Sequence, residues 1–512
     1  MVKGRVSRGT VYLVGAGPGD PKLITVKGLE ALKRAEVVVY DHLISEQLLD
    51  QAGPTARLIY VGKEKGRHAR TQTQINRLLV RTAKAGRIVV RLKGGDPMLF
   101  GRGGEEALAL VHAKIPYEIV PGVTSAIAVP AYAGIPVTHR GVSSSVSIIT
   151  GHEDPSKTDT TIPWKRLAAS SETLVCLMGV GALVKTVDGL IRYGRSKTTP
   201  CAVIEWGTLP RQRTIVGTLS TIASRCERLH LKPPAVIVIG QVVKLRDRLN
   251  WFERKRLFGL RIAVTRPLDR ADRLAELLQG LGAEVVTFPT IELVSTNSNG
   301  LFKRCVDRIE KFDWVFFTSP EGIHWFQRLL AAQRKDLRVL GGRQIGAIGP
   351  KTASSIQELG IRVDVVPRTY SQEGLLEGLK PRRLAGQRAL ILSAQGSRNV
   401  LEQGLRAKGM EVVRVPLYRT VIPSSLRRHV RGAFSQPFDY VTVTSSSCVD
   451  HLAQALRACG FSKVLRRLRF ASIGPVTSSA VRRAGGRVAV EARVSTVEGL
   501  VETITRAVRP RT

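Results

Sequence analysis

The chain of 512 residues exceeds what a single hydrophobic core holds, and its length predicts about three to four folding units. It carries 79 lysines and arginines against 41 aspartates and glutamates, a formal net charge of +38 that would ordinarily suggest a nucleic-acid partner. The basic residues are nevertheless scattered, aromatic residues make up only 5%, and no nucleic-acid-binding module is recognisable, so the sequence disfavours that class of function.

Two apolar runs near the start of the chain end in glycine-rich turns. Residues 11–14 lead into GAGPGD (15–20), and residues 87–92 lead into GGDP (94–97). Glycines after a strand let backbone approach a ligand at the carboxyl edge of a sheet, where α/β folds bind small molecules. The first turn departs from a dinucleotide fingerprint, because Asp20 replaces its third glycine and Pro18 removes an amide donor. NAD is therefore disfavoured.

Two further apolar runs end in charged residues. Residues 35–40 are typical of a buried parallel strand and precede Asp41, and residues 58–62 precede Lys63. Leucines and a valine at helical spacing over 23–32 predict a helix between the first two strands. For each charge alone, a solvated residue at a strand end is the commoner outcome, and an ion pair with a basic neighbour is the alternative for Asp41. Together, four side chains are expected to converge at one sheet edge: Asp20, Asp41, Lys63 and Asp96.

The first unit of the chain is expected to end near residue 253. The segment NWFERKRLFG (250–259) contains the longest basic run and separates a predicted strand at 235–240 from a new one at 261–265. We therefore predict a first enzyme at residues 9–253, a linker at 254–259 and a second enzyme at 260–510.

The second unit contains an internal repeat. DWVFFTS (313–319) matches DYVTVTS (439–445), and IGAIGP (345–350) matches FASIGP (470–475) at nearly the same spacing. IGAIGP and FASIGP are each followed by a short predicted helix and a Gly-x-x-Val strand start. The strands predicted at 262–266 and 284–286 have counterparts at 390–394 and 411–413. Two similar parallel-sheet α/β domains are therefore expected.

The cysteines indicate neither a metal site nor a disulfide framework. None forms a C-x-x-C motif and no histidine pair has zinc spacing, so no metal is expected. Their even number, with no recognisable signal peptide, indicates reduced thiols in a cytoplasmic protein. The longest nearly apolar stretch, residues 174–184, is too short to span a bilayer, so no membrane partner is expected.

Residues 9 to about 253 resemble uroporphyrinogen-III C-methyltransferase. The resemblance runs through nearly the whole domain and is most specific in GAGPGDPKLIT (15–25), YDHLIS (40–45), RLKGGDPMLFGRGGEE (91–106), PGVTSA (121–126) and GIPVTHR (134–140). It implies a two-lobed methyltransferase fold, S-adenosylmethionine as cosubstrate and a homodimer formed through this half.

The same resemblance implies roles for individual residues. Asp41 corresponds to the base and Lys63 to a proton donor, while Arg91 and Arg102 are expected to clamp substrate carboxylates. His139, in THR (138–140), is expected near substrate. Leu99 and Ser125 stand where family members often have Ile and Ala. The expected S-adenosylmethionine contacts are Pro18, Gly94, Gly95, Asp96, Leu99, Thr124, Ser125, Met178 and Gly207. For Met178, packing in the core is an equal alternative.

Residues 260 to about 508 resemble uroporphyrinogen-III synthase. The resemblance rests on short motifs in a fixed order, among them AVTRP (263–267), FPTIE (288–292), FFTSPEGI (316–323), VPLYRT (415–420) and IGPVTS (473–478). It implies one lobe built from 260–293 plus 421–510 and a second from 296–417, joined by two strands.

Tyr418 matches the position implied to assist departure of the substrate hydroxyl, and a strand-end tyrosine packed at the hinge is the equal alternative. Hydroxyls and amides on the predicted strand-to-helix turns are expected to hold substrate carboxylates, and these are Thr318, Ser319, Ser393, Thr444, Ser445, Gly474 and Thr477. The turn at 393–398 departs from the glycine-rich form expected for the family.

The sequence therefore predicts a bifunctional enzyme. Its second half would cyclise hydroxymethylbilane to uroporphyrinogen III with ring inversion, and its first half would methylate that product twice to precorrin-2, at the branch to siroheme and cobalamin. A methyltransferase acting on a later corrin intermediate is the alternative within the fold. A basic nucleic-acid-binding protein is the alternative from another class.

Overall fold

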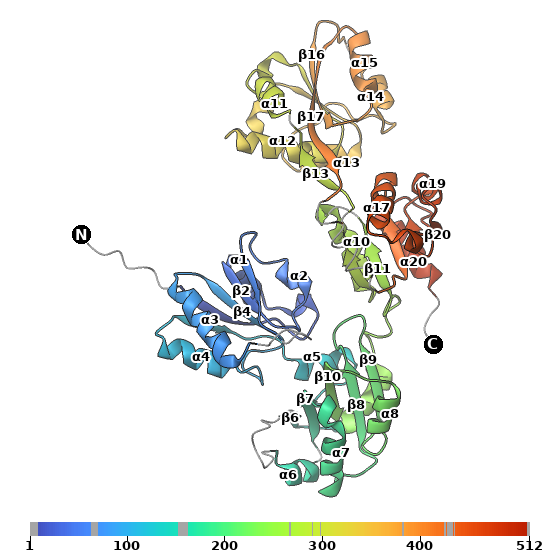
Figure 1. Cartoon of the computed structure of the whole chain (residues 1–512). Helices are drawn as coiled ribbons and strands as arrows, with labels where there is room; N and C mark the ends of the chain where they lie inside the picture. Colours follow the sequence, from blue (N-terminus) through green and yellow to red (C-terminus); the bar gives the residue numbers. More distant parts are fainter. Residues whose placement is uncertain are drawn as a thin grey trace, which may run out of the picture. The chain divides into compact units, whose positions relative to one another are not determined.

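The computed structural model of the chain (Figure 1) describes residues 9–62, 70–151, 162–170, 172–265, 268–288, 290–296, 298–380, 383–423, 426, 434 and 436–508. These residues form four five-stranded sheets flanked by helices, the α/β class that the sequence predicted. The chain divides into two compact units. Unit 1 is Met1–Arg261 with Leu277–Glu284 and Thr505–Thr512, and unit 2 is Ile262–Glu276 with Val285–Ile504.

The first sheet of unit 1 is parallel throughout and has the order β3-β2-β4-β1-β5. Its central strands are continuous runs of buried apolar residues, as a sheet covered on both faces requires. One face packs against α3 and α4, and the other against α1 and α2. The elements are β1 Val11–Gly15, α1 Val26–Arg34, β2 Val37–Tyr40, α2 Glu46–Leu49, β3 Arg57–Tyr60, α3 Gln72–Lys84, β4 Val89–Lys93, α4 Gly103–His112 and β5 Tyr117–Val120.

The second sheet of unit 1 is mixed and has the order β6-β7-β10-β8-β9. Strands β6 and β7 are parallel, whereas β10 is antiparallel to both of its neighbours. Helix α5 covers one face, and α6, α7 and α8 cover the other. The elements are α5 Ser125–Tyr132, β6 Val146–Thr150, α6 Trp164–Ala169, β7 Thr173–Leu177, α7 Leu183–Arg192, β8 Pro200–Glu205, β9 Arg213–Thr218, α8 Ile222–Arg228, β10 Ala235–Ile239 and α9 Arg246–Leu249.

The two sheets of unit 2 share the order of four of their five strands, which confirms the pair of similar domains. Their orders are β12-β11-β18-β19-β20 and β13-β17-β16-β14-β15. By the repeated motifs, β18 corresponds to β14 and β19 to β15, while β11 and β12 correspond to β16 and β17. These four strands therefore occur in the same order in both sheets. The strands are β11 Arg261–Val264, β12 Glu284–Thr287, β13 Glu292–Ser295, β14 Trp314–Phe317, β15 Gln344–Ala347, β16 Arg388–Ala394, β17 Glu411–Val421, β18 Tyr440–Val443, β19 Arg469–Ser472 and β20 Arg487–Glu491.

The helices of unit 2 follow the repeated strands. Each of β14, β15, β18 and β19 leads directly into a helix, as the repeat predicted. The second Gly-x-x-Val start becomes β20, but the first yields only an isolated bridge between Gly346 and Val365 among the described residues. The helices are α10 Leu268–Gly280, α11 Asn299–Val306, α12 Pro320–Ala332, α13 Pro350–Gln357, α14 Gln372–Gly378, α15 Val400–Ala407, α17 Ser446–Ala458, α18 Ser462–Leu465, α19 Pro475–Arg483 and α20 Val497–Ala507.

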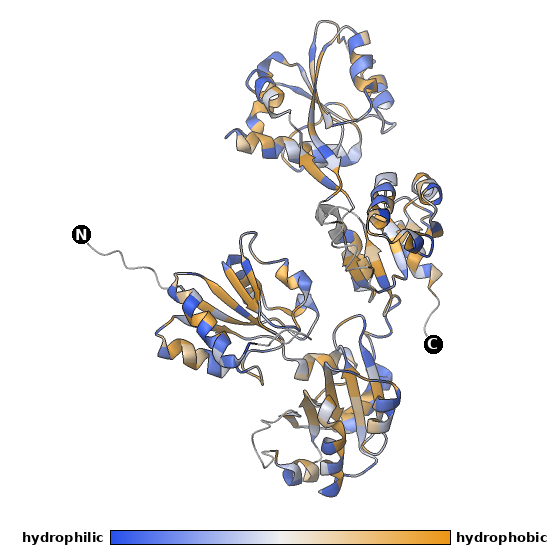
Figure 2. Cartoon of the chain, viewed as in Figure 1, coloured by the Kyte–Doolittle hydropathy of each residue, from blue (hydrophilic) through white to orange (hydrophobic). Residues whose placement is uncertain are grey.

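Hydrophobic residues are concentrated in the strands of the sheets, whereas the helices carry both hydrophilic and hydrophobic residues (Figure 2). In the sheet that contains β14, Trp314 and Phe316 are fully buried and their rings stack with centroids 5.3 Å apart. Because apolar burial is the dominant favourable term in folding, these strands form the cores on which the site loops are mounted.

The segment predicted as a linker is packed. Leu257 is fully buried and Phe258 nearly so, and the Leu257 amide donates to the carbonyl of Leu281. The two apolar residues that directly follow the basic run therefore anchor this segment. The boundaries of the two enzymes and of the synthase lobes stay predictions.

Leu257→Ala should destabilise the full chain by about 2–5 kcal/mol, since it removes a buried side chain and leaves a cavity. Leu249→Ala, at a side chain that is 46% exposed, is the matched control and should change stability by no more than about 0.5 kcal/mol. Chemical denaturation followed by fluorescence measures both. Equal, small effects would mean that the segment is an unpacked linker.

Candidate functional site

The two glycine-rich turns lie against each other at the carboxyl ends of β1 and β4. The amide of Gly95 donates to the carbonyl of Gly17 at 2.7 Å, and the Gly17 amide returns the contact at 3.2 Å. Both residues have positive φ, 83° and 68°, which glycine adopts without steric cost. At Gly15 a Cβ atom would lie 2.5 Å from the Gly122 backbone, so a third loop is equally close. The turns form one backbone-lined surface, as expected for a small-molecule site.

Asp96 organises this surface through backbone amides. One carboxylate oxygen accepts from the amides of Met98 and Leu99 at 2.8 and 3.2 Å, and the other accepts from Gly122 at 2.9 Å. Hydrogen bonds from backbone amides to a carboxylate are among the stronger ones in proteins. Asp96 therefore ties the loop after β4 to the loop after β5, a positioning role that the sequence did not reveal.

Asp20 links this surface to the second sheet of unit 1. Its amide donates to the Thr208 hydroxyl at 3.0 Å, and its carboxylate accepts the hydroxyl of Tyr132 at 2.9 Å. Burial and the neighbouring Asp20 charge raise the pKa of Tyr132, so the phenol stays protonated and remains the donor. Gly207, next to Thr208, packs so closely that a Cβ would lie 2.3 Å from Val129. Gly207, a predicted ligand contact, is thus also a position where close packing against Val129 requires glycine.

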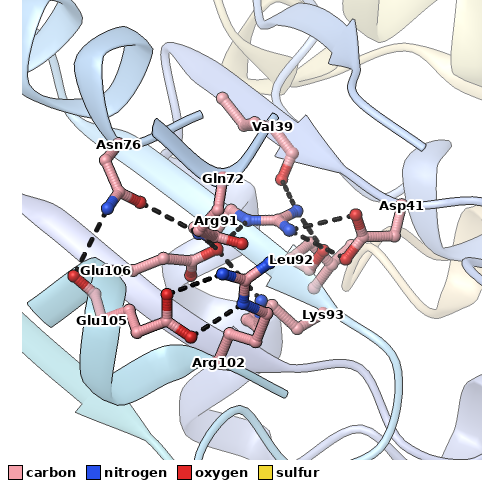
Figure 3. Close-up of polar contacts among 10 residues, drawn as sticks. All are labelled: Val39, Asp41, Gln72, Asn76, Arg91, Leu92, Lys93, Arg102, Glu105 and Glu106. Carbon is pink, nitrogen blue, oxygen red and sulfur yellow. Dashed lines mark hydrogen bonds and ion pairs between the residues drawn. The ribbon is translucent and has the colours of Figure 1, made fainter. Parts of the chain in front are cut away.

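Asp41 is held by a buried arginine (Figure 3). The Arg91 Nη2 atom contacts both carboxylate oxygens of Asp41 at 3.0 and 2.9 Å, while Arg91 Nη1 donates to the Val39 carbonyl. Arg91 is 2% exposed, whereas the Asp41 side chain is about one third exposed at 32%. The ion pair left open as the alternative for Asp41 is therefore present, and it leaves the carboxylate partly open to solvent.

The other side of Arg91 is occupied by Glu106. One oxygen of this fully buried carboxylate, Oε1, accepts from Arg91 Nε at 3.1 Å, Lys93 Nζ at 3.0 Å and Gln72 Nε2 at 3.2 Å. Its second oxygen, Oε2, is buried without a hydrogen-bond partner in the described part of the chain. Burial, then the neighbouring Arg91 charge, lower the pKa of Lys93 despite the contact with Glu106. Glu106 thus offsets the charges of two buried cations.

These contacts revise the predicted roles of the two arginines. The Arg91 side chain is buried with its donors directed at protein acceptors, a position that does not favour clamping of substrate carboxylates. The reason is its place inside β4, where strand alternation turns it toward α3 and α4. Arg102 is exposed and makes a two-point contact with Glu105 at 2.7 Å. Lys63 lies outside the described residues.

The three described acids do not form one cluster. Asp20, Asp41 and Asp96 all follow strands of the first sheet, but each carboxylate has its own partners and none contacts another. The exposed His139 ring contacts the carbonyl of Arg140. The three acids therefore share one edge of the sheet, as expected, but their carboxylates do not converge on a common point.

The remaining predicted cofactor contacts lie on turns of unit 1 or at the start of α5. Pro18, Gly94, Leu99 and Ser125 are partly exposed, and Thr124 caps α5 by accepting from the Ala126 amide. Met178 is 52% exposed, so packing in the core, the equal alternative for this residue, does not apply.

Backbone strain marks several residues that the sequence did not single out. Positive φ at a residue other than glycine is uncommon and concentrates at functional sites. Phe100, Trp206 and Thr208 have φ of 52°, 49° and 68°, beside predicted site residues, and Arg102 and Met178 share the feature. Large apolar side chains are also exposed after β2 and β4, at Leu43, Met98 and Phe100. In the sequence, the apolar pair Leu99-Phe100 inside a glycine-rich turn was the signal that could have indicated these residues.

In unit 2 the predicted synthase residues separate into exposed and buried positions. Tyr418 is 6% exposed, its hydroxyl lies 2.9 Å from the Ser319 hydroxyl, and its ring stacks on Trp325. It lies within β17 rather than at its end. Ser319 and Ser445 both cap helices, α12 and α17.

Ser393 and Thr477 are nearly fully buried, and Gly474 is buried as well. The Ser393 hydroxyl accepts from Arg414 Nε at 3.1 Å, so direct substrate contact by that hydroxyl is not favoured. Thr318 and Thr444 are partly exposed.

The described residues contain no group of three His, Cys, Asp or Glu side chains placed to hold a metal ion. Over the same residues, no helix combines the length and apolar character needed to cross a membrane.

Comparison with known proteins assigns each half to a family. Residues 10–223 match the model of tetrapyrrole (corrin/porphyrin) methylases, and residues 272–502 match that of uroporphyrinogen-III synthase HemD. Porphyrin biosynthesis protein HemD of Ruminiclostridium josui is 38% identical over 97% of this chain and 98% of its own length. Uroporphyrinogen-III C-methyltransferase of Methanocaldococcus jannaschii is 54% identical over 47% of this chain and 98% of its own. The native uroporphyrin III C-methyl transferase of Thermus thermophilus, a crystal structure, is 43% identical over 46% of this chain and all of its own, with a TM-score of 0.41.

Glu106→Ala should destabilise the chain by about 3–5 kcal/mol, because it leaves Arg91 and Lys93 buried without their carboxylate. Glu105→Ala removes the neighbouring but exposed carboxylate and should cost no more than about 1 kcal/mol. Chemical denaturation of both variants measures the difference. Similar losses would show that the buried network contributes no more than a surface pair.

Proposed function

The chain belongs to the tetrapyrrole methylases through its first half and to the uroporphyrinogen-III synthases through its second, and we propose that it forms uroporphyrinogen III and methylates it twice to precorrin-2. It is a bifunctional enzyme of tetrapyrrole biosynthesis with methyltransferase and synthase activities. The observation that carries the assignment is the continuous similarity to one relative along nearly the full length of both chains. The product and the inversion of the last ring belong to the proposal.

In the methyltransferase half, we assign proton removal to Asp41. Transfer of a methyl group to a pyrrole carbon forms a carbon–carbon bond, breaks the methyl–sulfur bond of the donor, and leaves a cationic ring system that must lose a proton. Asp41 lies at the carboxyl end of β2 with its carboxylate partly exposed, so it is accessible to such a proton. Arg91 contacts both of its oxygens and thereby fixes the orientation of the carboxylate.

The turns of unit 1 fit S-adenosylmethionine as the methyl donor. When bound, it supplies an electrophilic methyl group on a sulfonium. Added at Gly94, a Cβ atom would meet only Leu43, at 3.5 Å, so the backbone there is open to a ligand. We place the ligand against Pro18, Gly94, Gly95, Leu99, Thr124, Ser125, Met178 and Gly207. Asp96 would act chiefly by holding the loops, because both of its oxygens already accept backbone amides.

In the synthase half, we assign Tyr418 a part in the departure of the substrate hydroxyl. Its own hydroxyl is within hydrogen-bond distance of Ser319, which caps α12, so the phenol is fixed in position. Thr318, Ser319, Thr444 and Ser445 are the predicted carboxylate contacts that remain partly exposed. The buried Ser393 and Thr477 would act by shaping their turns.

Asp41→Asn should slow methylation by roughly 10²- to 10⁴-fold, the usual cost of a lost general base, while binding of S-adenosylmethionine stays within about twofold. Glu46→Gln, an exposed acid-to-amide change in α2, is the control and should leave the methylation rate unchanged. Single-turnover methylation and calorimetry give the two quantities. A rate near that of the parent enzyme would leave Asp41 with a structural role only.

Anaerobic incubation of hydroxymethylbilane with the full chain tests the reaction sequence. Without S-adenosylmethionine we expect the type III isomer of uroporphyrinogen, and with it a product heavier by two methyl groups, identified by mass and isomer analysis. Formation of the type I isomer alone would contradict the synthase assignment. Formation of uroporphyrinogen III without its methylation would instead favour the alternative of a methyltransferase for a later corrin intermediate.

A further inference from the structure

A concave feature lies at the amino end of the first sheet, opposite the glycine-rich turns. It is a pocket of about 530 Å³ between the edge strand β3 and helix α3, with an apolar floor that includes Val37 and Leu78. Four arginines line it, Arg57, Arg70, Arg81 and Arg87, and we call it the basic pocket. Val37 begins β2 and Asp41 directly follows that strand, so the two sites are separated by roughly 13 Å of extended chain.

One of the four arginines is neutralised within the pocket. Arg87 pairs with Glu36 at 2.6 Å, and the other oxygen of Glu36 accepts the Ile88 amide at 2.8 Å. The amide and the guanidinium hold the pKa of Glu36 below its ordinary value, so it stays ionised and committed to these partners. Glu36 is the one acidic residue among the described residues that line the pocket. Its charge is balanced by Arg87, so no described carboxylate of the lining remains for the other three arginines.

The other three guanidiniums have no acceptor in the described part of the chain. Arg57 begins the edge strand, Arg81 is in the last turn of α3, and Arg70 precedes that helix. Among the described residues, the pocket thus gathers three guanidiniums without a carboxylate partner beside an apolar floor. Like charges so placed repel one another, and the arrangement is stabilised when an anion binds between them. The planar fork of arginine matches the geometry of phosphate and carboxylate groups.

We propose that the basic pocket is a binding site for a compact oxyanion with at least two negative charges, either a phosphate ester or a polycarboxylate. Its volume falls within the range of small-molecule sites. Because it lies at the amino ends of β2 and β3, such a ligand would occupy a site separate from the methyl-transfer residues. The proposal does not depend on the assignment of the reaction.

The test is calorimetric titration of the full chain with pyrophosphate and, separately, citrate at constant ionic strength. Each should bind with a dissociation constant of about a millimolar or tighter. Arg57→Gln combined with Arg81→Gln should weaken binding by roughly tenfold or more, since each guanidinium supplies charge-assisted hydrogen bonds. Arg77→Gln is the matched control, because Arg77 is an exposed arginine of α3 that does not line the pocket. It should change the dissociation constant by less than about twofold.

The comparison of the two ligands identifies the chemistry. Tighter binding of pyrophosphate would indicate a phosphate ester, and tighter binding of citrate a polycarboxylate. Equal weakening by the control and by the double variant would attribute binding to the diffuse positive charge of the chain and overturn the proposal. So would a failure of both ligands to bind. Thermal melting without ligand checks the fold, and the double variant should melt no lower than the parent, because it removes mutually repelling charges.

Discussion

The first sheet depends on one buried carboxylate. Glu106, at the start of α4, accepts hydrogen bonds from Arg91 and Lys93, which both project from the central strand β4. A buried ion must be paired and hydrogen-bonded to be tolerated, so α4 must dock with Glu106 over these two cations. The chain between β4 and α4 is thereby closed into the loop 94–102, which contains the second glycine-rich turn. Arg91 then extends the same network to Asp41 on the neighbouring strand.

Much of this fold could be predicted from the pattern of the sequence. Runs rich in valine predicted the parallel strands. The repeated Thr-Ser and Ile-Gly-Pro motifs predicted two similar domains, whose sheets share the order of four strands. The Thr-Ser motifs also have a physical explanation, because Ser319 and Ser445 cap the helices that follow. A capping hydroxyl serves the fold first, which is why a repeated motif alone could not separate structural from substrate-binding residues.

The candidate site was predictable in its location and less so in its contacts. Arg91 was expected to face substrate, but alternation along β4 turns it toward the helices, where it is buried. The partner that explains it is 15 residues later, and a single sequence does not reveal that pairing. A usable signal was present nevertheless. Two cations inside an otherwise apolar central strand require a buried anion, and Glu106 follows the adjoining glycine-rich loop.

We propose that Glu106 orients Asp41 through Arg91, so that a buried carboxylate positions the group to which we assign proton removal. A double-mutant cycle with Asp41→Asn and Glu106→Gln, read as the single-turnover methylation rate, tests it most directly. If Glu106 acts through Asp41, Asp41→Asn should slow the reaction much less in the Glu106→Gln background than in the parent chain. Independent effects, with the two rate losses multiplying in the double variant, would show that Glu106 does not act through Asp41.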